Sequence, residues 1–232
     1  MVRWADDTGP GAFDAEQAHA YAAAMDIETA FPHDQVFLDL LWHHAHGAAL
    51  DLGGGTGRYA AWLLAMGLAP SVHVIDQSPL MIDACRRRGV PGLSVQVADI
   101  ETVNLGRQQY DIALARFVLM HVKDLVETVK HIALSLKEHG ILAMVTNVIE
   151  GTPTALTAWS EDTSGIMKLL LQAQGKPIRV SNYVRTQAEY THALQQAGLH
   201  IAFQEQYEPK ILRFEEEQPG IILSHLVLVG KK

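Results

Sequence analysis

The first place in the chain where chemistry is expected is a glycine-rich turn between two apolar runs. Residues 49–58 read Ala-Leu-Asp-Leu-Gly-Gly-Gly-Thr-Gly-Arg, with glycine at the alternate positions Gly53, Gly55 and Gly57. Glycine adopts backbone angles that other residues avoid, and it has no Cβ to block a ligand. A strand, a tight turn and a helix N-terminus in this order present backbone N–H groups to a ligand. The stretch therefore predicts a nucleotide-type binding site.

The spacing of these glycines disfavours two common phosphate-binding motifs. A dinucleotide fingerprint that begins at Gly53 needs Gly or Ala at the position occupied by Arg58, because that position packs closely against a strand. The chain also lacks the G-x-x-x-x-G-K-[ST] pattern of a phosphate loop. The pattern that stands here is D-x-G-x-G-x-G.

Acidic residues recur at the ends of the first three apolar runs. Asp51 lies in the first run, Asp76 ends the second at 19 residues beyond Gly57, and Asp99 follows the third. A carboxylate has paired acceptor oxygens, which suit the two hydroxyls of a ribose. Ligands of open α/β sheets bind at the carboxyl ends of the strands. Three acids at three strand ends therefore predict a ribosyl ligand at one edge of a sheet.

The elements expected to position these residues alternate between strands and helices. The predicted strands cover residues 49–52, 72–76, 93–98, 110–115, 141–148, 199–207 and 221–229. The predicted helices between them cover residues 59–66, 79–88, 125–136 and 187–197, with Ser78 and Thr186 as N-caps. Such alternation with short turns predicts an α/β fold with a doubly wound, mostly parallel seven-stranded sheet, which ends in an antiparallel strand pair.

The segments outside this alternation define the expected domain organisation. Residues 1–47 are predicted to form an N-terminal helical lid, with helices at Phe13–Met25 and His33–His44. Residues 48–150 form the ligand-binding core. An insertion at 151–185, with a helical piece at Ile166–Gln174, is expected to shape a second pocket. Residues 186–232 supply the last helix and the two strands that complete the sheet.

The D-x-G-x-G-x-G turn, the two later acids and the segment Tyr110–Asp124 resemble the class I methyltransferases that bind S-adenosylmethionine (SAM), of the small-molecule type. The resemblance covers about residues 48–150. It implies that SAM is the cofactor and that a further set of residues contacts it. Those expected cofactor-binding residues are Asp51, Gly53, Gly55, Gly57, Asp76, Gln77, Asp99, Ile100, Ala115, Arg116 and Tyr21.

The same resemblance assigns roles within this set. Asp76 would accept the ribose hydroxyls, Asp99 the adenine amino group, and Ile100 would cover the adenine ring. The backbone after the fourth strand would hold the amino-acid end of SAM, and Tyr21 would close over the sulfonium.

The acceptor end is less defined. His121 is the candidate catalytic residue, either as a general base or as a residue that positions the loop. Asn147 and Tyr183 are the expected substrate-binding residues.

The function predicted from these features is in-line methyl transfer from SAM to a nitrogen or oxygen of a small molecule, within a dry and shaped pocket. A second reading keeps SAM but makes it the substrate: attack of its own α-amino group would give azetidine-2-carboxylate and methylthioadenosine. A third reading is a non-catalytic SAM-binding subunit or sensor. A NAD-dependent reductase is disfavoured by Arg58. The residues leave the acceptor atom and any general base open.

The composition of the chain indicates which classes of binding partner and which location are expected. The net charge is −8 and the only basic run is Arg86-Arg87-Arg88, so no nucleic-acid partner is expected. The single cysteine, Cys85, excludes an intramolecular disulfide and suits a reducing, cytoplasmic location. No apolar run reaches about 18 residues, so no membrane span is expected. The run His43-His44-Ala45-His46 lacks a convergent acid or cysteine, and no metal is predicted. Whether the chain acts as a monomer or a homodimer stays open.

Overall fold

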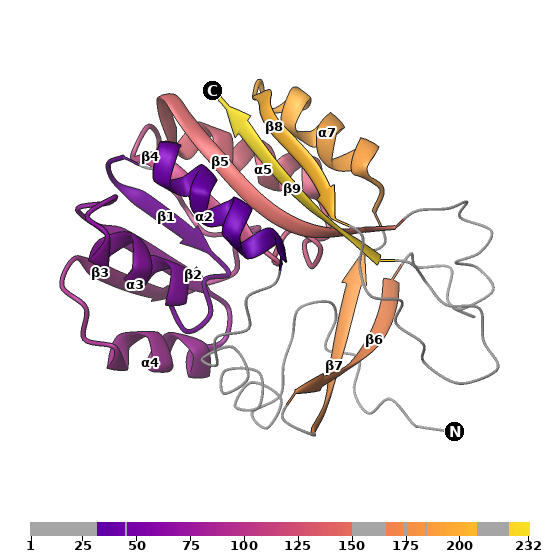
Figure 1. The fold of residues 1–232 in the computed structure, drawn as a ribbon, viewed down its shortest axis with the longest axis horizontal. Helices are drawn as coiled ribbons and strands as arrows, with labels where there is room; N and C mark the ends of the chain where they lie inside the picture. The colour runs from indigo at the N-terminus through magenta and orange to yellow at the C-terminus, as the bar shows by residue number, and fades with distance from the viewer. Residues whose placement is uncertain (1–31, 45, 150–165, 174–175, 184, 208–222) are drawn as a thin grey trace.

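A seven-stranded sheet with helices on both faces organises the molecule (Figure 1). The computed structural model describes residues 32–44, 46–149, 166–173, 176–183, 185–207 and 223–232. The strand order is β3-β2-β1-β4-β5-β9-β8. The first five of these strands are parallel, and β9 runs antiparallel to both of its neighbours. The predicted doubly wound α/β fold with an antiparallel strand pair at its end is therefore confirmed.

The strands lie close to their predicted positions. They are β1 (Ala49–Leu52), β2 (Val72–Asp76), β3 (Leu93–Val97), β4 (Tyr110–Arg116), β5 (Leu136–Ile149), β8 (His200–Tyr207) and β9 (Leu223–Lys231). The predicted turn before the fifth strand is instead a bulge inside β5, where His139 has a φ of 67° and the register with β4 shifts. The strand therefore begins directly after the preceding helix.

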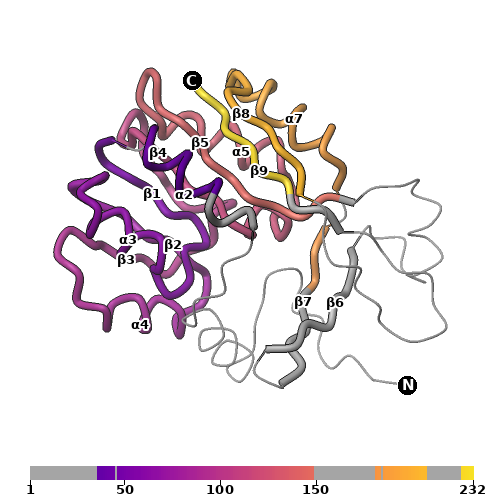
Figure 2. Tube along the Cα trace, viewed as in Figure 1, coloured from indigo at the N-terminus to yellow at the C-terminus, as the bar shows by residue number. Residues whose placement is uncertain are grey.

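Five described helices pack on the large sheet, and Figure 2 traces how the chain passes between its two faces. They are α2 (Pro32–His44), α3 (Arg58–Ala65), α4 (Pro79–Arg87), α5 (Leu125–Ser135) and α7 (Gln187–Gln196). Buried side chains of α2, α3 and α4 share one core cluster, and those of α5 and α7 share the other. Each face of the sheet is therefore covered by its own layer of helices.

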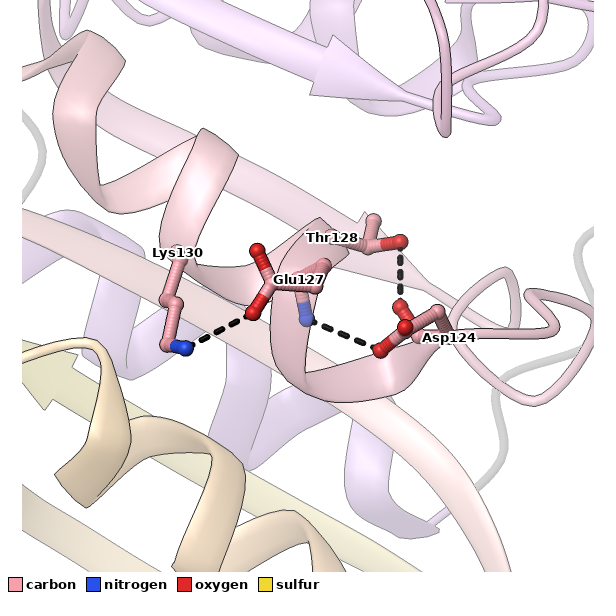
Figure 3. A network of polar contacts seen from close by, with 4 residues as sticks. All are labelled: Asp124, Glu127, Thr128 and Lys130. Atoms are coloured by element: carbon pink, nitrogen blue, oxygen red, sulfur yellow. Dashed lines mark hydrogen bonds and ion pairs between the residues drawn. The ribbon is translucent and has the colours of Figure 1, made fainter.

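Side-chain caps fix where the later helices begin. The Ser78 hydroxyl accepts the Met81 N–H at the start of α4, and α7 begins with a capping box formed by Thr186 and Glu189. At α5 the Asp124 carboxylate accepts the Glu127 N–H at 3.0 Å (Figure 3). Both caps predicted from the sequence, Ser78 and Thr186, are confirmed.

The helix α2 lies in the segment that was expected as a lid, and its apolar side chains pack on the sheet. The helix predicted at residues 33–44 is present, but Phe37 and Leu41 are fully buried in the core and α2 packs against β5 and β9. Burial of these apolar side chains makes α2 part of the helical layer on the sheet. The rest of the expected lid, residues 1–31 with the predicted helix that holds Tyr21, lies outside the described residues.

The insertion also differs from its prediction. Residues expected as a helical piece form β6 (Ile166–Ala173), which pairs antiparallel with β7 (Lys176–Tyr183) as a separate two-stranded sheet. A short apolar run has no periodicity that separates strand from helix. Pairing with β7 along the whole length of β6 decides the outcome. Figure 1 shows this hairpin on the side of the large sheet where β5 ends.

The glycine turn gives a stability prediction. Gly57 has a φ of 76°, and a Cβ there would lie 2.3 Å from the Cys85 Sγ, whereas Gly55 has a φ of 55° and an open side. Gly57→Ala should lower the free energy of unfolding by about 2–4 kcal/mol, from left-handed strain plus overpacking. Gly55→Ala should lose about 1–2 kcal/mol from strain alone. Urea denaturation measures both values.

Cys85→Ala provides the control. It removes the clashing sulfur, so a double-mutant cycle with Gly57→Ala should show recovery of the overpacking component. Equal losses for Gly55→Ala and Gly57→Ala would contradict the role of the sulfur contact.

Candidate active site

The glycine turn and the end of β2 are joined by one carboxylate. One oxygen of Asp76 accepts the Gly55 N–H at 3.0 Å, and the other accepts the Ser78 N–H at 2.8 Å. Burial raises the pKa of Asp76, and these two N–H groups partly offset the rise. Each carboxylate oxygen keeps a second lone pair for a ligand hydroxyl. Because a Cβ at Gly55 would meet nothing within 4 Å, there is room for a ligand beside the turn.

Asp51 is a second carboxylate at this edge, and it is almost completely buried. Its side chain is 3% exposed, and its Oδ2 has no hydrogen-bond partner among the residues that the structure describes. Burial and the negative charge of Asp76 raise the pKa of Asp51 to about 7, against the opposing effects of Arg116 and the Ala60 N–H. A buried acceptor without a donor is rare in folded proteins. Asp51 is therefore suited to a cationic, hydrogen-bond-donating ligand.

Arg116, at the end of β4, lies on the same face of the sheet as Asp51. Its guanidinium stacks on the rings of Tyr59 at 5.0 Å and Phe117 at 4.7 Å. Arg58 lies 5.0 Å from the same Tyr59 ring and donates to the Tyr59 hydroxyl. Stacking on aromatic faces restricts the motion of a guanidinium.

The backbone after β4 makes a sharp turn. Phe117 has a φ of 52°, in the left-handed region that a bulky residue rarely adopts. Its N–H donates to the Val145 carbonyl at 2.7 Å, which holds the turn against β5. Ala115, the residue expected to bind the cofactor through its backbone, has a fully buried side chain inside the sheet.

The residues predicted for the adenine end lie where β3 leads into the next loop. Asp99 is exposed and its carboxylate accepts the Glu101 N–H at 2.9 Å. Gln77 is exposed beside Asp76. Ile100 is only 7% exposed and packs into the core cluster below the edge, so little of its side chain is left to cover a ring. The backbone at the end of β3 is tied to β2 by the Ala98 N–H, which donates to the Asp76 carbonyl at 3.1 Å.

At the predicted acceptor side of the site, the loop after β4 contacts the hairpin. The Tyr183 N–H donates to the Met120 carbonyl at 2.8 Å, and the His121 Nδ1 lies 3.0 Å from the Ser181 carbonyl oxygen. Burial lowers the pKa of His121, although hydrogen bonding to the Ser181 and Phe117 backbone opposes the shift. A neutral imidazole whose Nδ1–H donates to Ser181 fits this contact. The ring therefore joins the loop to β7.

Asn147 occupies the end of β5. Arg116, the last residue of β4, pairs with Val145, so Asn147 lies two residues beyond the end of β4. Its Oδ1 is buried and has no partner among the described residues. Asp51, Gly55, Asp76, Arg116 and Asn147 are thus gathered at the carboxyl ends of the central strands. Tyr21 lies outside the described residues.

Three residues important to this region were not among the predicted site residues. The Tyr59 ring is stacked by the guanidinium groups of Arg58 and Arg116. Arg185 is only 7% exposed and donates to three carbonyls of the loop after β4, those of Leu119, Val122 and Lys123. Asn182 is buried in β7. The Arg58-Tyr59 dipeptide directly after the glycine turn was a usable signal for the first. Nothing in the sequence signals the burial of the other two.

Metal and membrane features are not found in the described residues. Within those ranges, no group of three His, Cys, Asp or Glu side chains is close enough to hold a metal ion. His43 and His44, from the histidine-rich run, are exposed at the end of α2. None of the helices that the structure describes is long and apolar enough to cross a membrane.

Comparisons with known proteins agree with this geometry. Residues 50–144 match the family model described as a methyltransferase domain. Over 121 residues, 50% of this chain, the sequence is 34% identical to an uncharacterized 37.1 kDa protein of a Streptomyces fradiae transposon, and the match spans 35% of that relative.

Two solved structures show the same fold. A candidate SAM-dependent methyltransferase from Listeria monocytogenes superposes with a TM-score of 0.61 at 19% identity, covering 84% of this chain and 97% of that one. A candidate sarcosine dimethylglycine methyltransferase from Galdieria sulphuraria gives 0.71 at 12% identity, covering 94% and 98%. Residues 50–144 therefore match a methyltransferase domain, and the chain has the fold of solved structures described as SAM-dependent methyltransferases, whose cofactor is SAM.

Proposed function

We propose that this protein binds SAM at the carboxyl edge of β1, β2 and β4 and transfers its methyl group to a nitrogen or oxygen of a small molecule. The observation that carries the proposal is the buried Oδ2 of Asp51, which has no partner among the described residues. It lies beside a glycine turn already tied to Asp76. SAM carries an α-ammonium and a sulfonium, and both charges suit an edge with one buried and one half-buried acid.

Each of the proposed binding residues contacts a different part of SAM. Asp76 accepts the ribose hydroxyls, the open side of Gly55 admits the ribose, and Asp99 and the end of β3 lie at the adenine end. Asp51 accepts the α-ammonium and Arg116 donates to the carboxylate of the methionine part. SAM supplies an activated methyl group, so the protein chiefly aligns the two reactants and excludes water.

On the acceptor side, we assign His121 a positioning role. Its Nδ1 bonds the Ser181 carbonyl and its pKa is lowered by burial, so it holds the hairpin against the loop after β4. Asn147 and Tyr183 border the acceptor. A small acceptor suits the net charge of −8, since a nucleic acid would be repelled. The amine-directed name of the Galdieria sulphuraria relative supports a small amine, by analogy of fold alone.

The direct test is incubation of the purified protein with SAM alone, followed by mass spectrometry of the nucleoside products. We expect SAM to bind without turnover, and S-adenosylhomocysteine to form only when a metabolite extract is added. Formation of methylthioadenosine from SAM alone would show that the protein catalyses an internal cyclisation of SAM and not methyl transfer. Absence of SAM binding, measured by titration calorimetry, would refute the proposal.

The proposed contact between Arg116 and the carboxylate of SAM can be tested by comparing SAM with decarboxylated SAM. Arg116→Gln should weaken SAM binding by about 10- to 100-fold, because one charge-assisted hydrogen-bonding group is lost. The same variant should leave the affinity for decarboxylated SAM, which lacks the carboxylate, within about twofold. Titration calorimetry of both ligands measures the difference.

Arg58→Gln is the matched control. Arg58 stacks on the same ring at the same 5.0 Å but follows the glycine turn, not β4, so its loss should not change the ratio of the two affinities. Equal weakening of both ligands by Arg116→Gln would contradict a specific contact with the carboxylate.

The raised pKa of Asp51 predicts a pH dependence. Protonated Asp51 cannot pair with the α-ammonium, so SAM affinity should fall by up to about tenfold per pH unit below pH 7, the region of its pKa. Asp51→Asn should bind SAM weakly and lose this component. Calorimetry between pH 5.5 and about pH 8.5 follows the change.

The same residue should act on stability with the opposite sign. The folded-state pKa of Asp51 is raised from 3.8 to about 7, so the folded state holds the proton more tightly and stability falls as pH rises through this range. Asp51→Asn should therefore raise the melting temperature of the ligand-free protein more at pH 8 than at pH 5. The exposed control Asp83→Asn should show no such difference.

A further inference from the structure

Asn182 is the most completely buried side-chain amide in the described part of the chain, and it makes no hydrogen bond. It is 1% exposed, and neither its Oδ1 nor its Nδ2 has a partner among the residues that the structure describes. Buried polar atoms are almost always paired, because a donor or acceptor removed from water without a replacement destabilises the fold. An amide unpaired at both ends therefore calls for an explanation from function.

The backbone around Asn182 is fixed on both sides of the residue. The Ser181 carbonyl bonds the His121 ring at 3.0 Å, and the Tyr183 N–H bonds the Met120 carbonyl at 2.8 Å. The register pairs Asn182 itself with Met167 of β6. The strand is thus held between β6 and the loop after β4, so the amide is presented on a rigid backbone.

The direction of the Asn182 side chain follows from strand alternation. Tyr183 turns toward Arg185, whose guanidinium lies 4.9 Å from the ring centroid. Arg185 is itself held by carbonyls of the loop after β4, among them Leu119 and Val122. Neighbouring side chains of a strand point to opposite faces. Asn182 therefore points away from Arg185.

The position relative to the cofactor edge sets which ligand Asn182 meets. The loop that β7 contacts, residues 117–121, directly follows Arg116 at the end of β4. Asp76 and the end of β3, which suit the ribose and adenine, lie two and three strands from β4 in the sheet order. A group near β7 is consequently at the methyl end of the site, where the acceptor must lie.

We propose that Asn182 determines acceptor specificity, by recognising a neutral group in which an N–H donor and a carbonyl acceptor are adjacent, as in a carboxamide or a lactam. A side-chain amide has one acceptor and one donor end, and such a group satisfies both at once. A site built to hydrogen-bond a substrate group discriminates strongly against an analogue that lacks it, because its own polar atoms are then left unpaired. The inference rests on the proposed function, since it requires the acceptor to lie beside bound SAM.

The test uses two probes of nearly equal shape, 4-fluorobenzamide and 4-fluoroacetophenone, of which only the first has the N–H donor. Each is titrated by fluorine NMR into protein saturated with S-adenosylhomocysteine, which occupies the cofactor site without allowing turnover. The amide should bind at least about tenfold more tightly than the ketone. Asn182→Leu, which has a similar volume, should abolish this preference.

Melting temperatures separate recognition from a structural role. Because the Asn182 amide has no partner, Asn182→Leu should leave the melting temperature of the ligand-free protein unchanged or raise it. The matched control is Thr146→Val: Thr146 is equally buried, but its hydroxyl donates to the Tyr190 hydroxyl at 2.8 Å. That variant should lower the melting temperature by about 2–4 °C.

Two results would overturn the inference while leaving the proposed function intact. One is binding of S-adenosylhomocysteine with no preference for the amide probe, or with a preference that survives in Asn182→Leu. The other is a fall in melting temperature for Asn182→Leu as large as that for Thr146→Val. If the wild-type protein binds neither SAM nor S-adenosylhomocysteine, the proposed function fails and the inference fails with it.

Discussion

The two hydrogen bonds to Asp76 connect the parts on which the candidate site depends. One carboxylate receives the Gly55 N–H from the loop after β1 and the Ser78 N–H from the loop after β2. Ser78 also caps α4, so the same carboxylate is linked to the start of a helix. The loop after β1 is joined to β2 a second time by the Gly54 N–H, which donates to the Ile75 carbonyl at 3.3 Å. Asp76 therefore links the two loops, in addition to its proposed role in ligand binding.

A second buried acid close by makes this edge electrostatically unfavourable. Burial and, after it, the charge of Asp76 raise the pKa of Asp51, and Arg116 only partly compensates. A cation relieves such a site more than a neutral molecule does. In the proposed methyl transfer from SAM the sulfonium becomes a neutral thioether, so the attraction between the edge and its proposed ligand would decrease as the product forms. The same imbalance that lowers the stability of the ligand-free fold would thus favour the exchange of product for fresh cofactor.

The sequence predicts the site best where a local motif determines the backbone. The glycine turn, the acid at the end of β2 and the N-caps Ser78 and Thr186 depend on neighbours within a few residues, and they are found as expected. The segment Ile166–Gln174 was predicted as a helical piece. Its residues 166–173 instead form β6, because this apolar run becomes a strand only through its pairing with β7. The sequence pattern predicted that α2 is a helix, but it did not predict that this helix packs on the sheet. Phe37 and Leu41 reach the core only because β5 and β9 offer an apolar face.

The acceptor side could not be predicted for a related reason: it is made by contacts between residues about 60 positions apart in the chain. Arg185 holds the carbonyls at 119, 122 and 123, while Ser181 and Tyr183 hold His121 and Met120. Between this anchored loop and the end of β4 stands Phe117, in a strained left-handed conformation and stacked on Arg116. Strain of this kind persists only when the surroundings fix the backbone on both sides. The hairpin and β5 supply those two sides, so Tyr183, proposed to border the acceptor, and Arg116, proposed to hold the cofactor carboxylate, are positioned by one continuous set of contacts.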